Sequence, residues 1–240
     1  MIELKDVTKM FGRTCAVDAL DLFIPEGEFF SLLGPNGAGK TTTLKLVTGL
    51  LKPTKGKVFV GSYDMAEKNI EAKRLISYIP DIPYVYEKLT AREFLRFIGD
   101  LYHLDRRACR EKTENLLDLF FMRDYGDQLM ESYSHGMKQK IVICSALIPD
   151  PRVIIIDEPM VGLDPKTIRL VKDILRGRAD EGATVLMSTH TLSLAEEISD
   201  RIGIIHKGKL IGLGSIEEIK KTSMRTERFE DIFLRMTAEE

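Results

Sequence analysis

The stretch GPNGAGKT, residues 34–41, fits the pattern G-x-x-x-x-G-K-[S/T]. It follows the apolar run EFFSLL at residues 28–33 and precedes TTLKLV at residues 42–47, which is typical of a helix. A glycine-rich loop between a buried strand and a helix lets backbone N–H groups surround phosphate oxygens. The context therefore favours a phosphate-binding loop over an ordinary glycine-rich turn.

Three side chains of this loop have predicted roles at a nucleoside triphosphate. Lys40 places a positive charge on the β- and γ-phosphates, the Thr41 hydroxyl can ligate Mg²⁺, and Thr42 can donate to the α-phosphate. The expected cofactors are a nucleoside triphosphate and Mg²⁺. The predicted nucleotide-binding residues of the loop are Gly34, Asn36, Gly37, Ala38, Gly39, Lys40, Thr41 and Thr42.

Two carboxylates, Asp157 and Glu158, follow the apolar run in the segment RVIIIDEP, residues 152–159. The apolar run predicts a buried strand, and successive side chains of a strand point to opposite sides. Asp157 is therefore expected to hold Mg²⁺, and Glu158 to polarise the attacking water as a general base. A solvated strand end is the alternative, but a carboxylate buried there without a cation would be costly.

Composition limits the class of protein. The chain has 240 residues and a formal net charge of -2, which gives no global attraction to nucleic acid. Cys15, Cys109 and Cys144 form no CxxC pair, so we expect each to be a small apolar side chain in a reducing compartment. No apolar run approaches the ~20 residues of a membrane span. A membrane role would need a partner that supplies the spans.

Periodicity predicts an α/β chain with a helical insertion. Strands and helices alternate around a parallel sheet, whereas residues 90–148 are mostly helical. The segment LDLFI, the turn PEG and the segment EFFSLLG predict a hairpin over residues 20–34, and AEKNIEAKRLI predicts a helix over 66–76. TARE at 90–93 and SIEE at 215–218 are predicted capping boxes.

Three further segments, taken together with the loop and the acid pair, make the pattern specific. YSHGMKQK at 133–140 precedes the acid pair, VGLDP at 161–165 follows it, and TVLMSTH at 184–190 comes next. This order resembles the nucleotide-binding domain of ATP-binding cassette (ABC) transporters. The resemblance extends from Ile2 to about Gly214 and implies that the nucleotide is ATP.

The resemblance also implies a fold: a RecA-like P-loop NTPase core with an N-terminal antiparallel β subdomain and an inserted α-helical subdomain. Residues 1–240 would be a single ABC ATPase domain. Residues 1–83 and 150–214 would form the core with the β subdomain, and 84–149 the helical subdomain with the signature motif. Residues 215–240 would be a short helical extension.

Further site residues follow only from the resemblance. Phe11 matches the aromatic residue that stacks on adenine, although a core phenylalanine is the alternative. Asp164 matches the aspartate of the D-loop, and His190 matches the switch histidine at the γ-phosphate. Ser134 and Gly136 match the signature residues that contact ATP held by the opposite subunit, so a head-to-tail dimer with two ATP molecules is implied.

Three positions depart from the family pattern: Asp81, His135 and Met137, which replaces the glutamine of the signature. Asp81 stands where a glutamine is expected to contact Mg²⁺; it supplies an oxygen but cannot donate as an amide does. His135 replaces the first glycine of the signature, where a solvated or dimer-facing side chain is expected. The predicted metal ligands are therefore Thr41, Asp157 and Asp81.

We expect the ATPase subunit of a membrane transporter, most like ABC-2-type export systems, at the cytoplasmic face of the membrane. Its expected partners are a membrane permease subunit and a second nucleotide-binding domain, with no nucleic acid. PDIPYVYEKLT at 80–90 is the candidate docking surface. The alternative is a soluble ABC ATPase that acts on ribosomes or DNA. A P-loop GTPase is excluded because the sequence has no N-K-x-D motif.

Overall fold

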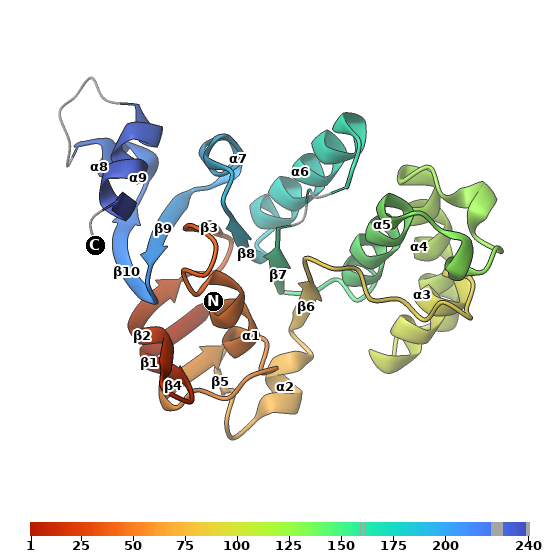
Figure 1. Cartoon of the computed structure of the whole chain (residues 1–240). Coiled ribbons are helices and arrows are strands. Elements are labelled where there is room, and N and C mark those ends of the chain that lie inside the picture. The colour runs from red at the N-terminus through yellow and green to blue at the C-terminus, as the bar shows by residue number, and fades with distance from the viewer. Residues whose placement is uncertain (159, 161, 222–227, 239–240) are drawn as a thin grey trace.

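The structure is a computed structural model that describes residues 1–158, 160, 162–221 and 228–238. Within these ranges the strands form two sheets (Figure 1). The first sheet consists of β1 (Ile2–Phe11), β2 (Thr14–Ile24), β4 (Lys55–Val60) and β5 (Tyr63–Asp64). The second consists of β3 (Phe29–Leu33), β6 (Ile76–Ile79), β7 (Val153–Asp157), β8 (Thr184–Thr189), β9 (Arg201–His206) and β10 (Lys209–Gly214).

The first sheet is antiparallel, with strands in the order β2-β1-β4-β5. Along β1, Ile2, Leu4 and Val7 are buried, and the polar residues between Leu4 and Val7 are exposed. This pattern is typical of a half-buried strand. The sheet packs its apolar side on the helix that follows the phosphate loop, because both contribute to one hydrophobic cluster.

The second sheet has the order β10-β9-β3-β8-β7-β6. All its neighbours run parallel except β10, which pairs antiparallel with β9. The predicted hairpin of β2 and β3 is wrong. All five residues of β3 are buried, and the strand needs neighbours on both sides, which β8 and β9 supply. The PEG turn therefore carries the chain from one sheet to the other.

Helices cover both faces of the second sheet. The helices around it are α1 (Lys40–Val47), α2 (Asn69–Lys73), α6 (Pro165–Asp180), α7 (Leu192–Ile198), α8 (Ile216–Lys221) and α9 (Phe229–Ala238). Phe30, Ile155 and Leu186 share a cluster with α1, whereas Phe29 and Ile154 share one with α6. The helix predicted over 66–76 is wrong in extent, because only α2 forms there and the chain enters β6 soon after.

A separate group of helices lies between β6 and β7, at the right of Figure 1. It consists of α3 (Ala91–Leu101), α4 (Arg106–Leu119) and α5 (His135–Leu147), with short 3-10 turns η1 (Arg123–Tyr125) and η2 (Met130–Ser132). Thr90 and Glu93 form the predicted capping box at the start of α3. Asp105 caps α4, because its side chain accepts from the backbone N–H of Ala108. The predicted helical insertion is therefore present.

Two other predictions concern cysteines and membrane spans. Cys109 and Cys144 are buried, as expected for small apolar side chains, but Cys15 is exposed near the start of β2. The prediction for Cys15 is wrong because that strand end lies outside the core. Across the described ranges no helix has the length and apolar character that crossing a bilayer requires.

Candidate nucleotide site

The parallel strands bring the predicted site residues to one edge of the second sheet. Leu33 at the end of β3 pairs with Thr189 of β8, and Asp157 at the end of β7 pairs with Ser188. Parallel strands end at the same edge, so the loops that follow them meet there. The phosphate loop, the acid pair and the segment that leads to His190 therefore converge in space although they lie far apart in sequence.

Close backbone contacts fix the phosphate loop. Gly39 has φ 109°, and a Cβ there would lie 2.5 Å from the carbonyl oxygen of Ala16. Only glycine fits this position without strain. The Lys40 ammonium donates to the carbonyl oxygens of Gly34 at 2.7 Å and Pro35 at 3.1 Å. Burial lowers the pKa of Lys40, against the opposing charges of Glu158 and Asp157.

A cavity of about 370 Å³ opens beside this loop. Its walls come from the loop, from the start of α1, from β2, and from the ends of β6 and β7. The lining residues are Ala16, Asn36, Gly37, Ala38, Gly39, Lys40, Thr41, Thr42, Asp81, Asp157 and Glu158. Backbone N–H groups at the N-terminus of α1, the Lys40 ammonium and the carboxylates therefore share one space, as the triphosphate and its metal would require.

Asp157 is suited to a divalent cation. Its side chain is buried, and Oδ1 accepts a hydrogen bond from the Ser188 hydroxyl. Within the described residues Oδ2 is also buried but has no hydrogen-bond partner. An unsatisfied buried carboxylate oxygen is costly unless a cation binds it. In the part of the chain that the structure describes, no group of three or more His, Cys, Asp or Glu side chains could hold a metal ion.

Glu158 is held by the segment at the end of β8. The Thr189 hydroxyl donates to Oε2 at 3.3 Å, and Nδ1 of His190 lies 2.8 Å from Oε1. Glu158 itself has φ 48°, which is unusual for a residue with a side chain. The backbone strain and the two contacts together orient the carboxylate, which lines the cavity. The arrangement suits a base that must face a fixed water.

Asp81 also lines the cavity. It directly follows Pro80, and β6 ends at Ile79. Tyr78 lies close by: burial, with the charges of Asp157 and Asp81, raises the pKa of its hydroxyl. Tyr78 therefore stays neutral and adds no further negative charge. Asp81 thus lines the same cavity as Asp157, and its role as a third oxygen ligand stays a prediction.

The signature residues lie on a different surface. Ser134 is the N-cap of α5, and its hydroxyl accepts from the backbone N–H of Met137 at 3.3 Å. Ser134 and His135 are exposed. None of the residues 134–136 lines the cavity described above. One chain therefore holds the predicted signature apart from its own predicted nucleotide site.

His135 packs against the segment that follows the acid pair. A Cβ at Gly162 would lie 2.6 Å from the His135 ring, and one at Gly136 would lie 2.7 Å from the Gly162 carbonyl oxygen. Asp164 caps α6 through Thr167, and Lys140 of α5 lies 3.5 Å from its carboxylate. The sequence predicts a solvated or dimer-facing His135 and gives no sign of its contact with Gly162. That contact depends on how the chain folds.

A further predicted site residue does not line the cavity, and two residues that were not predicted contact the acid pair. Phe11 ends β1 with 49% of its surface exposed, so it is no core residue, but it does not line the cavity. The sequence prediction missed Ser188 and Thr189, which bind Asp157 and Glu158. The signal for both was their place at the end of a predicted parallel strand.

Known proteins resemble this chain in sequence. The sequence pattern of the family described as "ABC transporter" matches residues 17–161. The daunorubicin/doxorubicin resistance ATP-binding protein DrrA of Streptomyces peucetius is 37% identical over 221 residues, which are 92% of this chain and 67% of DrrA. The SkfA peptide export ATP-binding protein SkfE of Bacillus subtilis is 35% identical over 88% of this chain and 87% of SkfE. For two other relatives the match spans 39% of their length.

Solved structures show the same fold. An ATP-binding subunit of an ABC transporter has a TM-score of 0.94 and 31% identity, over 98% of this chain and 99% of the other. A dimeric ATP-binding cassette in a post-hydrolysis state, bound to ADP and Pi, has a TM-score of 0.82 and 27% identity, over 90% of this chain and 98% of the other. The predicted P-loop NTPase fold and the predicted family are confirmed. The chain belongs to the ABC transporter family, as one of its ATP-binding ATPase subunits.

Proposed function

We propose that the chain powers export through a separate membrane permease at the cytoplasmic face of the membrane. Two ATP-binding subunits would close head to tail on two ATP molecules. The separation of Ser134–Gly136 from the cavity beside Lys40 carries this proposal, since one chain then supplies two half-sites. The dimeric state of a similar cassette supports it, and the similarity to SkfE, a peptide export ATP-binding protein, supports export.

The proposed reaction is hydrolysis of the bond between the β- and γ-phosphates. Glu158 orients the attacking water and accepts its proton, and Lys40 balances the charge that moves onto the β-phosphate oxygens. Mg²⁺, held by Asp157 and Thr41, would neutralise phosphate charge. Ser134 and Gly136 of the other subunit hold the γ-phosphate until it leaves. Once the γ-phosphate leaves, its contact with Ser134 and Gly136 is lost. The open dimer is then favoured, because ATP binds the closed dimer better than the open one.

A docking surface for the permease is proposed at residues 82–86. Ile82, Tyr84 and Tyr86 are exposed, with Tyr84 at 77%. The Tyr86 ring packs edge-on against Phe94 and Phe97 of α3, at 6.0 and 5.6 Å between centroids. An exposed apolar patch beside the predicted Asp81 ligand suits a helix from a membrane subunit.

The proposal is tested with Glu158→Gln. The variant is expected to bind ATP, lose turnover by about 10²–10⁴-fold, and form an ATP-dependent dimer seen by size-exclusion chromatography. Glu197→Gln, an exposed carboxylate that pairs with Lys172, is the matched control. A fully active Glu158→Gln enzyme would refute the base assignment. Co-purification with ribosomes or DNA, instead of a multi-span membrane protein, would favour the alternative function.

A further inference from the structure

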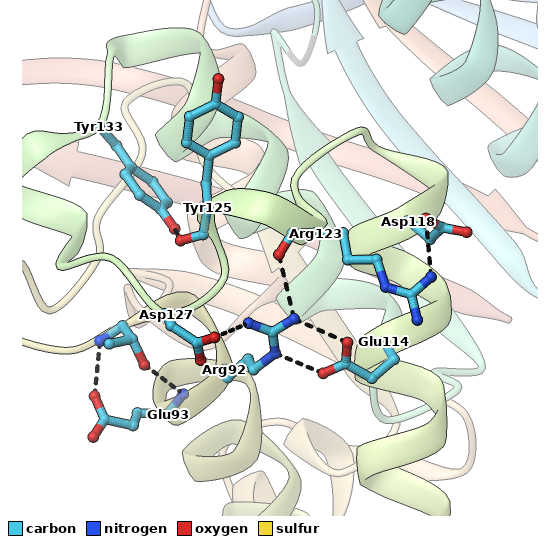
Figure 2. A network of polar contacts seen from close by, with 9 residues as sticks. Arg92, Glu93, Glu114, Asp118, Arg123, Tyr125, Asp127 and Tyr133 are labelled. Atoms are coloured by element: carbon cyan, nitrogen blue, oxygen red, sulfur yellow. Dashed lines mark hydrogen bonds and ion pairs between the residues drawn. The ribbon is translucent and has the colours of Figure 1, made fainter.

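Arg92, in the first turn of α3, contacts two other segments of the chain, α4 and the loop that follows it (Figure 2). Its Nε and Nη2 donate to the two carboxylate oxygens of Glu114 in α4, at 2.6 and 3.0 Å. Its Nη1 lies 2.7 Å from Oδ2 of Asp127, and Nη2 also donates to the carbonyl oxygen of Arg123 at 3.3 Å. Arg92 thus joins α3, α4 and the loop that follows α4.

The backbone adds to this contact. The Arg92 N–H donates to the carbonyl oxygen of Gly126 at 3.2 Å. A Cβ at Gly126 would overlap the guanidinium, so the loop backbone lies directly on it. The two-pronged contact with Glu114 needs the planar fork of arginine, which lysine lacks. The side chain and the backbone of Arg92 therefore hold residues 123–127 against α3.

This loop leads into the signature. Tyr133, the residue before the Ser134 cap, is buried, and its hydroxyl donates to the carbonyl oxygen of Tyr125 at 2.6 Å (Figure 2). Residues 123–127, which Arg92 holds, thus anchor the side chain just before the start of α5. A shift of the loop would move the Ser134 cap with it.

The segment before α3 holds the same region from the other side. The N–H groups of Met130 and Glu131 donate to the carbonyl oxygens of Leu89 and Glu87, both at 3.0 Å. The Glu87 carboxylate accepts from the Lys138 ammonium of α5 at 2.6 Å. Residues 87–92 therefore contact the loop and the first turns of α5, directly after the proposed docking surface at 82–86.

From these contacts we infer that Arg92 is a positioning residue, which sets where Ser134 and Gly136 meet the nucleotide of a second subunit. It does so without touching nucleotide itself. Without its fork the loop at 123–133 loses attachments to α3 and α4, and the start of α5 populates more positions. The closed dimer then forms less readily, because its binding-competent state is less populated. This inference rests on the head-to-tail dimer of the proposed function.

The test uses Glu158→Gln as the background, because that variant is expected to accumulate the ATP-bound dimer. Arg92→Ala is added, and the ATP concentration for half-maximal dimer is measured by analytical ultracentrifugation. A rise of roughly tenfold is expected, with unchanged affinity of the monomer for a fluorescent ATP analogue. Arg92→Lys keeps the charge but loses the fork, and is expected to behave like Arg92→Ala.

Two further variants control for folding. Arg107→Ala removes an exposed arginine that pairs along α4 with Glu111, and is expected to leave dimerisation unchanged. Asp127→Asn weakens the ion pair between Arg92 and Asp127. Because the Asp127 side chain is 84% exposed, this variant is expected to fold and tests the inference even if Arg92→Ala does not fold. It is expected to raise the ATP requirement by a few fold.

The outcomes separate this inference from the function on which it rests. A Glu158→Gln protein that does not dimerise with ATP refutes the head-to-tail dimer. Normal dimerisation of Glu158→Gln together with Arg92→Ala overturns only the role of Arg92. Parallel loss of monomer nucleotide affinity would also overturn it, since a positioning role predicts that the monomer site is untouched. Full dimerisation with Arg92→Lys would overturn the requirement for the fork.

Discussion

Nδ1 of His190 lies 2.8 Å from Oε1 of Glu158, so the two predicted catalytic side chains are in direct contact. Glu158 follows β7, whereas His190 follows β8, and the pairing of these parallel strands brings them together. His190 is the more exposed partner, with 58% of its side chain accessible against 19% for Glu158. The histidine therefore orients the carboxylate, and its exposure leaves the ring open to the predicted contact with a γ-phosphate.

His190→Ala is expected to reduce kcat on the order of a hundredfold, as for loss of one oriented donor. Nucleotide affinity should change little, because His190 does not line the cavity. Steady-state phosphate release and nucleotide titration measure the two effects. The control is His103→Asn, at an exposed histidine with φ 56°, a conformation that asparagine tolerates. A His190→Ala enzyme with normal kcat would contradict this role.

Lys40→Ala is expected to weaken ATP binding by about ten- to a hundredfold, the usual loss for a hydrogen bond to a charged group. The Lys40 ammonium donates to the carbonyl oxygens of Gly34 and Pro35. Among the described residues that line the cavity, no other cationic side chain could replace it. Isothermal titration of ATP measures the change. Lys45→Ala, in the last turn of the same helix, is the control and should bind ATP normally. Equal affinities for both variants would sink the prediction.

Asp81→Ala is expected to raise the Mg²⁺ concentration needed for half-maximal hydrolysis. Asp81 lines the cavity with Asp157, and its carboxylate is the predicted third oxygen ligand. The measurement is ATPase rate against Mg²⁺ concentration at saturating ATP. Asp173→Ala, at an exposed position on α6, serves as the control. An unchanged Mg²⁺ requirement would remove Asp81 from the set of metal ligands.

Asp164 gives a prediction about pH. Hydrogen bonds from the hydroxyl and N–H of Thr167 hold its pKa at about 2, below the ordinary value of 3.8. Because the pKa is lowered on folding, the stabilisation is present above pH 3.8 and is lost as the pH falls towards 2. Asp164→Ala should therefore cost about 1 kcal/mol of unfolding free energy at neutral pH, as for other N-caps.

Urea unfolding of both proteins at neutral pH and near pH 3 tests this expectation. The difference between wild type and Asp164→Ala should shrink at the lower pH. A difference that stays constant with pH would mean that Asp164 acts through packing alone. Asp173→Ala, also on α6 but away from the cap, is expected to show neither effect.

Local patterns in the sequence determined much of this protein. The loop at Gly34–Thr41, the capping box of Thr90 and Glu93, and the Ser134 cap of α5 all depend on residues a few positions apart. Such short-range bonds and periodicities are visible in the letters. They sufficed to predict the alternation of strands and helices, the helical insertion and the phosphate loop.

Only the tertiary structure decided which distant segments meet. β2 and β3 follow one another in sequence, yet they lie in different sheets, because the fully buried β3 required β8 and β9 as neighbours. The bond from Ser188 to Asp157 and the contacts of Arg92 with Glu114 likewise join residues that no local pattern relates. Strand pairing and burial of apolar faces select such contacts, and both depend on the whole chain.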